Sequence, residues 1–183
     1  ISGSTTGYPF VSKAANAFMK GQDGLDILVE STGSGKGIDQ LIRGQVDIAV
    51  SSRYLADKEI TRAAAIGIHL VPFQIAYDYV IPITHPKNAI KTISEQQLQA
   101  IFSGKIDNWK ALGGPDQKIN VISRDKTSGT YDLWESKILD GNSLVKTAQF
   151  VESNFDMVEA VSNNSHAIGY ISHGYLNFHV KPI

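Results

Sequence analysis

Residues 118–134 read KINVISRDKTSGTYDLW, a stretch that combines a strand, a polar turn and a helix. The run from Lys118 to Ser123 predicts a strand that leads directly into the turn. The apolar face of the following helix comes from Tyr131, Leu133, Trp134 and Ile138. The turn between them, Ser123 to Thr130, is rich in hydroxyls. A helix N-terminus presents unpaired N–H groups and about half a positive charge, so this composition favours anion binding.

The same unit of strand, polar turn and helix recurs upstream. The further turns are Gly3-Ser4-Thr5-Thr6, Gly33-Ser34-Gly35-Lys36-Gly37 and Ser51-Ser52-Arg53. One such turn would be weak support, because Ser and Thr are also the commonest N-cap residues. Four of them, two with an arginine, predict a site for a small oxyanion.

The two arginines differ in how strongly the sequence supports ligand contact. Arg124 has a planar fork that can hold two oxygens of one anion, and Asp125 is placed to orient it. Taken alone, Arg124 and Asp125 would read as an ordinary surface pair, and the other three turns favour the anion site. For Arg53, ligand contact and a solvated or lobe-bridging role are equally compatible with the sequence.

The composition limits the class of protein. The chain has 183 residues, is 42% hydrophobic, and carries 17 Lys plus Arg against 18 Asp plus Glu. This balance disfavours a nucleic-acid partner, because nucleic-acid affinity depends on a basic field. There is no cysteine, and no apolar stretch of about 18 residues that would span a membrane. Ile1 resembles the last residue of a strand, so we expect upstream residues to be missing.

Strand and helix segments alternate along the chain, which predicts an α/β fold with mainly parallel sheets. Predicted strands include Leu25–Glu30, Val46–Ser51, Ile68–Phe73 and Ala167–Ile171. A long extended run from Ile75 to Ile83 contains Pro82, which suits a sheet edge or end, and predicts a crossing into a second lobe. We therefore expect lobe 1 to comprise residues 1–76 and 172–183, and lobe 2 residues 77–171. The ligand cleft is expected between the lobes.

Catalytic machinery is not evident, so the sequence predicts binding and not an enzyme. Gly33 to Gly37 resembles a P-loop, but Glu30 and Gly37 stand where that motif needs Gly and Ser or Thr. No Gly-x-Ser-x-Gly elbow has plausible partners, and the five histidines lack metal-ligand spacing. We expect neither a metal nor a cofactor.

Six ordered motifs resemble the substrate-binding proteins of phosphate ABC transporters, the PstS-like branch of the periplasmic binding protein superfamily. They are Gly3-Ser4-Thr5, Gly33-Ser34-Gly35-x-Gly37, Asp47-Ile48-Ala49-x-Ser51-Ser52-Arg53, Ile101-Phe102-Ser103-Gly104-Lys105-Ile106-x-Asn108-Trp109, Arg124-x-x-x-Ser128-Gly129-Thr130 and Ile168-Gly169-Tyr170-Ile171. The resemblance covers nearly the whole chain. It implies a type II fold of two lobes, each a sheet flanked by helices, which close by a hinge on a dehydrated phosphate.

The resemblance and the polar turns together define the expected ligand-binding residues. These are Ser4, Thr5, Thr6, Ser34, Ser52, Arg53, Arg124, Ser128, Gly129 and Thr130. The implied partners are inorganic phosphate and the permease subunits of an ABC transporter. The resemblance also implies a monomer that is periplasmic or held at the cell surface, with any lipid anchor on a segment outside this sequence.

Two departures from the family pattern keep alternatives open. Some family members have an aspartate where Ser52 stands, and a serine lacks the repulsion by which a carboxylate excludes sulfate. The chain also ends at Ile183, before the Gly-x-Tyr-Pro segment usual in the family, so we expect a fragment or a processed form. The rival functions are binding of sulfate or molybdate, a sensory or adhesive module on the same scaffold, and a phosphatase that uses Ser34 or Ser128.

Overall fold

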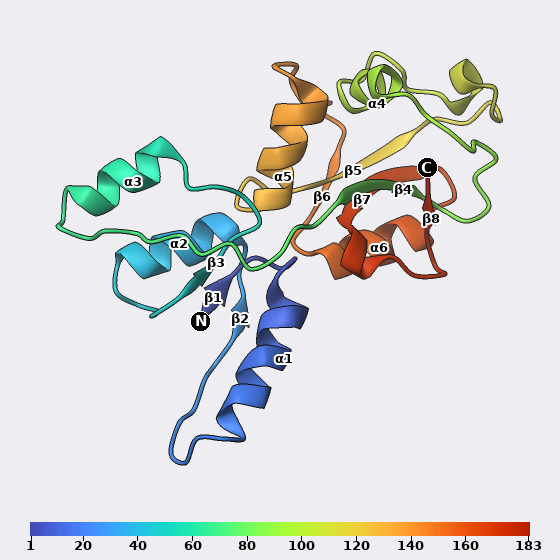
Figure 1. Ribbon diagram of the computed structural model, residues 1–183. Coiled ribbons are helices and arrows are strands. Elements are labelled where there is room, and N and C mark those ends of the chain that lie inside the picture. Colours follow the sequence, from blue (N-terminus) through green and yellow to red (C-terminus); the bar gives the residue numbers. More distant parts are fainter. The chain divides into compact units, whose positions relative to one another are not determined.

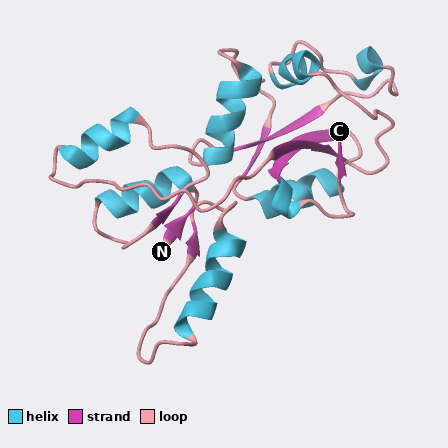
Figure 2. Cartoon of the chain, in the orientation of Figure 1, coloured by secondary structure: helices cyan, strands magenta, loops and turns pink.

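The computed structural model describes all residues from 1 to 183, and the chain forms two compact units. Unit 1 comprises Ile1–Tyr77 together with the short turn Thr127–Gly129. Unit 2 comprises Asp78–Lys126 and Thr130–Ile183. Helices and strands occur in both units, which confirms the predicted α/β class (Figures 1 and 2).

Unit 1 is built on a parallel sheet of three very short strands in the order β2-β1-β3. The strands are β1 (Ser2–Gly3), β2 (Glu30–Ser31) and β3 (Ala49–Val50), and the helices are α1 (Tyr8–Met19), α2 (Ser34–Ile42) and α3 (Asp57–Ala64). Gly3 has a φ of 141°, and a Cβ there would lie 2.1 Å from the carbonyl oxygen of Val50. Only glycine therefore permits the close approach of β1 and β3 at this point.

The core of unit 1 is small. Its fully buried apolar side chains are Ile38 and Ile42 of α2 and Ala63 of α3. Half-buried residues packed against them are Ala49, Leu55, Ile68 and Leu70. Many large apolar side chains of this unit are exposed instead, among them Leu28 and Phe73.

Unit 2 contains a mixed sheet of five strands in the order β6-β5-β7-β4-β8. The strands are β4 (Val80–Thr84), β5 (Asn120–Arg124), β6 (Gln149–Val151), β7 (Ala167–Ser172) and β8 (Lys181–Pro182). The first three in sheet order run parallel, and β4 is antiparallel to both β7 and β8. The helices are α4 (Glu95–Phe102), α5 (Gly129–Trp134), which continues as a π-helical turn over Glu135–Leu139, α6 (Asn154–Ser162) and two 3-10 turns at Trp109–Leu112 and His173–Tyr175.

Two hydrophobic clusters stabilise unit 2. One centres on Trp134, whose ring stacks on Tyr170 at a centroid distance of 4.2 Å and meets the edge of Phe102. The other contains Ile122 of β5 and Met157 of α6, both fully buried. The strands β5 and β7 of unit 2 are therefore covered, in contrast to much of the apolar surface of unit 1.

Local signals predicted several elements correctly. The capping box before α4 is present, because the Ser94 Oγ accepts from the Gln97 N–H at 3.2 Å and the Gln97 Oε1 accepts from the Ser94 N–H at 2.8 Å. The predicted strand from Lys118 to Ser123 corresponds to β5. The predicted end of α2 near Gly44 is also confirmed, with Gly44 at a φ of 67°.

Three sequence expectations differ from the structure. Only Glu30 of the predicted strand Leu25–Glu30 is in a strand, and Ile68–Phe73 forms no strand. Apart from the ladder of β1 with β2, main-chain hydrogen bonds of the first segment are limited to those of Leu28 and Glu30 with Ile1, and the second segment has only the bond from the Ile68 N–H to the Ala63 carbonyl. Residues 172–183, expected in lobe 1, belong to unit 2. The physical reason is long-range pairing, since β8 forms a ladder with β4 through Ile83↔Pro182 and Thr84↔Lys181.

Candidate anion-binding site

The start of α2 meets the turn after β3 within unit 1. Ser34 is the first residue of α2 and is 1% exposed. Its Oγ accepts a hydrogen bond from the Ser52 N–H at 3.1 Å, and the two hydroxyl oxygens lie 3.3 Å apart. Gly33 precedes the helix with a φ of 94°, a left-handed value that favours glycine. Two predicted site residues that are 18 positions apart are therefore in direct contact.

A third turn packs on the same two serines. A Cβ on Gly129 would lie 2.5 Å from the Ser34 Oγ and 2.7 Å from the Ser52 Oγ. The Gly35 N–H also donates to the Thr127 carbonyl at 3.0 Å. Three of the four predicted turns thus meet in unit 1. The space beside residue 129 admits no side chain, because the hydroxyls of Ser34 and Ser52 occupy it.

The first polar turn follows the central strand β1. The Ser4 N–H donates to the Val50 carbonyl at 2.8 Å, and the Ser4 Oγ accepts from the Gly7 N–H at 3.4 Å ahead of α1. Ser4 and Thr5 are buried, and Thr6 is half-buried. Because β1 and β3 are parallel, this turn and the turn at Ser52 leave the sheet at the same edge.

Arg53 is paired with a residue that the sequence interpretation missed. Its Nη1 and Nη2 donate to the two carboxylate oxygens of Glu59, each at 2.8 Å, and Glu59 also accepts from the Ala56 N–H at 2.8 Å. Burial raises the pKa of Glu59, but the hydrogen bonds from Arg53 and Ala56 outweigh it and hold that pKa below its usual value. The sequence did contain a signal for the position of Glu59, because a carboxylate at the third position of a helix commonly caps the helix start.

Arg124 lies in unit 2, at the carboxyl end of β5, and is 1% exposed. Its Nη2 donates to the Glu152 carbonyl at 2.6 Å and its Nε to the Val151 carbonyl at 3.3 Å. Burial lowers the pKa of Arg124, and the nearby phenol of Tyr170 and carboxylates such as Asp125 act in the opposite direction. The Arg124 guanidinium is charged at neutral pH, because arginine side chains stay protonated in proteins.

Tyr170 supports the strand end that carries Arg124. Its hydroxyl accepts from the Arg124 N–H at 3.1 Å and lies 3.0 Å from the Ser123 Oγ. Burial raises the pKa of Tyr170 to about 12, so the phenol stays protonated. Tyr170 was part of a motif in the sequence, but nothing in the pattern predicted this contact.

The ten predicted residues therefore divide between the units. Those of unit 1 are Ser4, Thr5, Thr6, Ser34, Ser52, Arg53, Ser128 and Gly129, and those of unit 2 are Arg124 and Thr130. Ser128 and Thr130 are each 2% exposed. In unit 1 these residues supply hydroxyls and helix-start N–H groups, and the nearby Glu59 carboxylate is already occupied by Arg53. Donors of this kind suit an anionic oxygen ligand.

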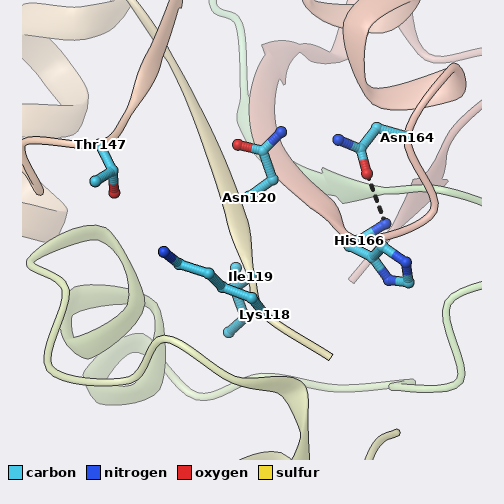
Figure 3. A pocket seen from close by; sticks show the side chains of 6 residues that line it. All are labelled: Lys118, Ile119, Asn120, Thr147, Asn164 and His166. Carbon is cyan, nitrogen blue, oxygen red and sulfur yellow. Dashed lines mark hydrogen bonds between the residues drawn. The ribbon is translucent and has the colours of Figure 1, made fainter. Parts of the chain in front are cut away.

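A separate cavity of about 280 Å³ lies in unit 2 (Figure 3). Its lining residues are Lys118, Ile119, Asn120, Thr147, Asn164 and His166. Asn120 begins β5 and His166 precedes β7, so the cavity lies at the amino ends of these strands. Arg124 ends β5, and the cavity is thus distinct from the predicted site.

Comparison with known proteins assigns the family. A model of the PBP superfamily domain matches residues 1–177. The chain belongs to the periplasmic binding protein (PBP) superfamily. Its PBP relatives include the phosphate-binding protein PstS of Borreliella burgdorferi, at 38% identity over 96% of this chain, and PstS of Bacillus subtilis, at 37% over 96%. The PstS-like resemblance is confirmed.

Solved PBP structures agree with this assignment. A substrate-binding protein of Clostridium perfringens, assigned to phosphate ABC transport and crystallised with bound phosphate, has a TM-score of 0.91 at 34% identity. The match covers all of this chain and 73% of that one. An ABC-type phosphate transport receptor from Vibrio cholerae has a TM-score of 0.73 at 33% identity. That match covers 100% of this chain and 74% of the receptor chain.

The chain spans 63% and 57% of the length of the two PstS relatives. Both relatives are named as binding proteins. The sequence likewise predicted a binding protein and not an enzyme. None of the helices in this structure combines the length and apolar character needed to cross a membrane.

Proposed function

We propose that this chain binds inorganic phosphate as the receptor part of an ABC transport system. The observation that carries the proposal is the convergence of Ser34, Ser52 and Gly129, from three turns far apart in sequence. The naming of the PstS relatives and the phosphate-bound Clostridium perfringens structure support phosphate as the anion.

Each predicted residue has a proposed role. Hydroxyls and N–H groups of the polar turns contact the phosphate oxygens, because hydrogen-bond donors of this kind suit an anionic oxygen ligand. The contributing residues are Ser4, Thr5, Thr6, Ser34, Ser52, Ser128, Gly129 and Thr130. Arg124 supplies the countercharge from unit 2.

Arg53 has a positioning role in this proposal. Glu59 occupies both terminal nitrogens of the Arg53 guanidinium, and the Nη1 also donates to the Tyr54 carbonyl at 2.9 Å. These bonds fix the turn that carries Ser52. Arg53 therefore orders the hydroxyl and does not itself need to touch the anion.

Titration calorimetry of the complete gene product with phosphate tests the proposal. We expect micromolar binding, which corresponds to about 8 kcal/mol. Ser34→Ala removes a hydrogen bond to a charged ligand, typically about 1.5–3 kcal/mol, and should weaken binding at least tenfold. Ser12→Ala is the matched control, because the Ser12 Oγ bonds only the Tyr8 carbonyl on exposed α1. No phosphate binding by the wild-type protein would refute the proposal.

Another tetrahedral oxyanion is a second candidate, favoured by one observation. Position 52 carries a hydroxyl, and the neighbouring carboxylate of Glu59 is engaged by Arg53. A site without a free carboxylate has no group that repels a fully ionised anion. Competition by sulfate and molybdate at several pH values distinguishes the candidates, since a sulfate receptor binds sulfate more tightly than phosphate throughout.

Delivery to permease subunits, an extracytoplasmic location and a monomeric state belong to the same proposal. The name of the Vibrio cholerae receptor, an ABC-type phosphate transport receptor, supports this transport role. Deletion of the gene should reduce phosphate uptake by the cell. Normal uptake together with retained phosphate binding would favour a sensory or adhesive module instead.

A further inference from the structure

Strand β5 loses one of its two neighbours before it reaches Arg124. Its ladder with β7 ends at the pair Val121↔Ile168. The ladder with β6 covers residues 122–124, and β7 continues along β4 as far as Ser172. Arg124 therefore lies where β5 and β7 are no longer paired. Because Arg124 is buried, its main-chain N–H still needs an acceptor.

The hydroxyl of Tyr170 supplies this acceptor. Tyr170 belongs to β7, and its phenol oxygen accepts from the Arg124 N–H at 3.1 Å and lies 3.0 Å from the Ser123 Oγ. Tyr170 and Ser123 are fully buried. A buried N–H without an acceptor is unfavourable, because no water replaces the lost bond. A side chain of β7 thus takes the place that a strand carbonyl has elsewhere in the sheet.

The ring of Tyr170 is held independently of this bond. It stacks on Trp134 of α5 at a centroid distance of 4.2 Å and an interplanar angle of 8°. Its centroid also lies 5.8 Å from that of Phe102 in α4. A close-packed aromatic cluster leaves a buried ring little room to move. The packing therefore keeps the hydroxyl in one place, under the end of β5.

The guanidinium of Arg124 is held by the other neighbour of β5. The carbonyls of Val151 and Glu152, at the end of β6, accept from its Nε at 3.3 Å and from its Nη2 at 2.6 Å. Tyr170 thus fixes the main chain of Arg124, and the end of β6 fixes the charged group. A group held in one orientation before its ligand arrives loses little conformational entropy on binding.

We propose that the Tyr170 hydroxyl is a positioning group for anion binding, which holds the end of β5 so that Arg124 presents its guanidinium in one orientation. This role rests on the proposed function, in which Arg124 supplies the countercharge of the phosphate. Tyr170 does not itself touch the anion, because its hydroxyl bonds Arg124 and Ser123 within unit 2. Loss of this one oxygen lowers the affinity and leaves every ligand-binding residue in the chain.

Calorimetric titration of the complete gene product with phosphate tests this role through Tyr170→Phe, which removes the hydroxyl and keeps the stacked ring. We expect an affinity about tenfold lower than that of the wild type. Trp109→Phe is the matched control, because it also removes a buried hydrogen bond of unit 2, from the Trp109 Nε1 to the His166 carbonyl at 3.0 Å. It should lower the unfolding temperature and leave the affinity unchanged. Equal affinity losses in the two variants, or none in Tyr170→Phe, would overturn the proposal.

A double-mutant cycle with Arg124 separates positioning from a general loss of stability. When Arg124→Ala is already present, Tyr170→Phe has no guanidinium left to position. It should then leave the phosphate affinity unchanged and still lower the unfolding temperature. A further tenfold loss of affinity in that background would contradict a role that acts through Arg124.

NMR of the isotope-labelled, ligand-free protein gives a readout that needs no phosphate. The Arg124 Nε–H donates to the Val151 carbonyl, so its exchange with water reports how firmly the guanidinium is held. We expect this exchange to be about tenfold faster in Tyr170→Phe than in the wild type. An unchanged rate would overturn the positioning role even if phosphate binds. Faster exchange in a protein that binds no phosphate would refute the proposed function and leave the positioning of Arg124 intact.

Discussion

Gly129→Ala is the substitution that most directly tests the candidate site. The added Cβ would start 2.5 Å from the Ser34 Oγ and 2.7 Å from the Ser52 Oγ, closer than real Cβ contacts allow. To reach even 3.0 Å, the Ser34 hydroxyl must retreat by 3.0 − 2.5 = 0.5 Å. Both serines would then lose their alignment toward the anion. Loss of two hydrogen bonds to a charged ligand corresponds to about 3 kcal/mol or more, that is a phosphate affinity lower by at least about 100-fold.

Calorimetric titration with phosphate and thermal unfolding of the complete protein should be run together. Alanine is a better helix former than glycine by up to about 1 kcal/mol, which offsets part of the strain from the added Cβ, and the unfolding curve separates a loss of binding from a loss of folding. Gly21→Ala is the control within unit 1, because a Cβ there meets only the Phe18 carbonyl oxygen at an ordinary 3.8 Å. If Gly129→Ala binds phosphate as tightly as the wild type, the three turns do not form the anion site.

Three further outcomes follow from buried polar groups. Arg124→Ala should weaken phosphate binding by at least about 2 kcal/mol by calorimetry, because the anion loses its countercharge; unchanged affinity would remove Arg124 from the site. Glu59→Gln should destabilise unit 1 in urea unfolding by about 1–3 kcal/mol, since the partly buried Arg53 loses the carboxylate that balances its charge. The pKa of Glu59 is lowered in the folded state, so this stabilisation is present above the unfolded value of 4.5 and is lost as pH falls through the folded pKa; the variant should lack that acid-dependent loss. Thr84→Val should raise stability by up to about 1 kcal/mol, because the buried Thr84 hydroxyl has no partner, whereas Thr84→Ser should lower it.

Local chemistry made the polar turns and several helices predictable from sequence. The capping box of Ser94 and Gln97 acts within one helical turn, so its signal is complete in the sequence. The turns at Ser4 and Ser52 follow neighbouring parallel strands, and parallel strands place their carboxyl ends at the same end of a sheet, as the predicted parallel sheet implies. The family resemblance extended these signals to the rest of the candidate site.

Features that depend on distant partners were not predictable. The run Ile68–Phe73 has strand composition, but a strand forms only when another backbone supplies its hydrogen bonds. Residues 172–183 belong to unit 2 because β8 pairs with β4. The paired residues are about a hundred positions apart in the sequence, so no local pattern encodes this pairing. The ion pair of Arg53 with Glu59 was missed because an arginine in a polar turn is equally suited to a ligand and to a carboxylate.

The ion pair between Arg53 and Glu59 has a kinetic consequence. Because the carboxylate balances the guanidinium next to it, the hydroxyl turns of unit 1 contribute little long-range field, and the whole chain has a formal charge of −1. Electrostatic steering of an anion from solution needs an extended positive potential. Added salt should therefore change the phosphate association rate only slightly, and the encounter is governed by diffusion and by short-range contacts formed after arrival.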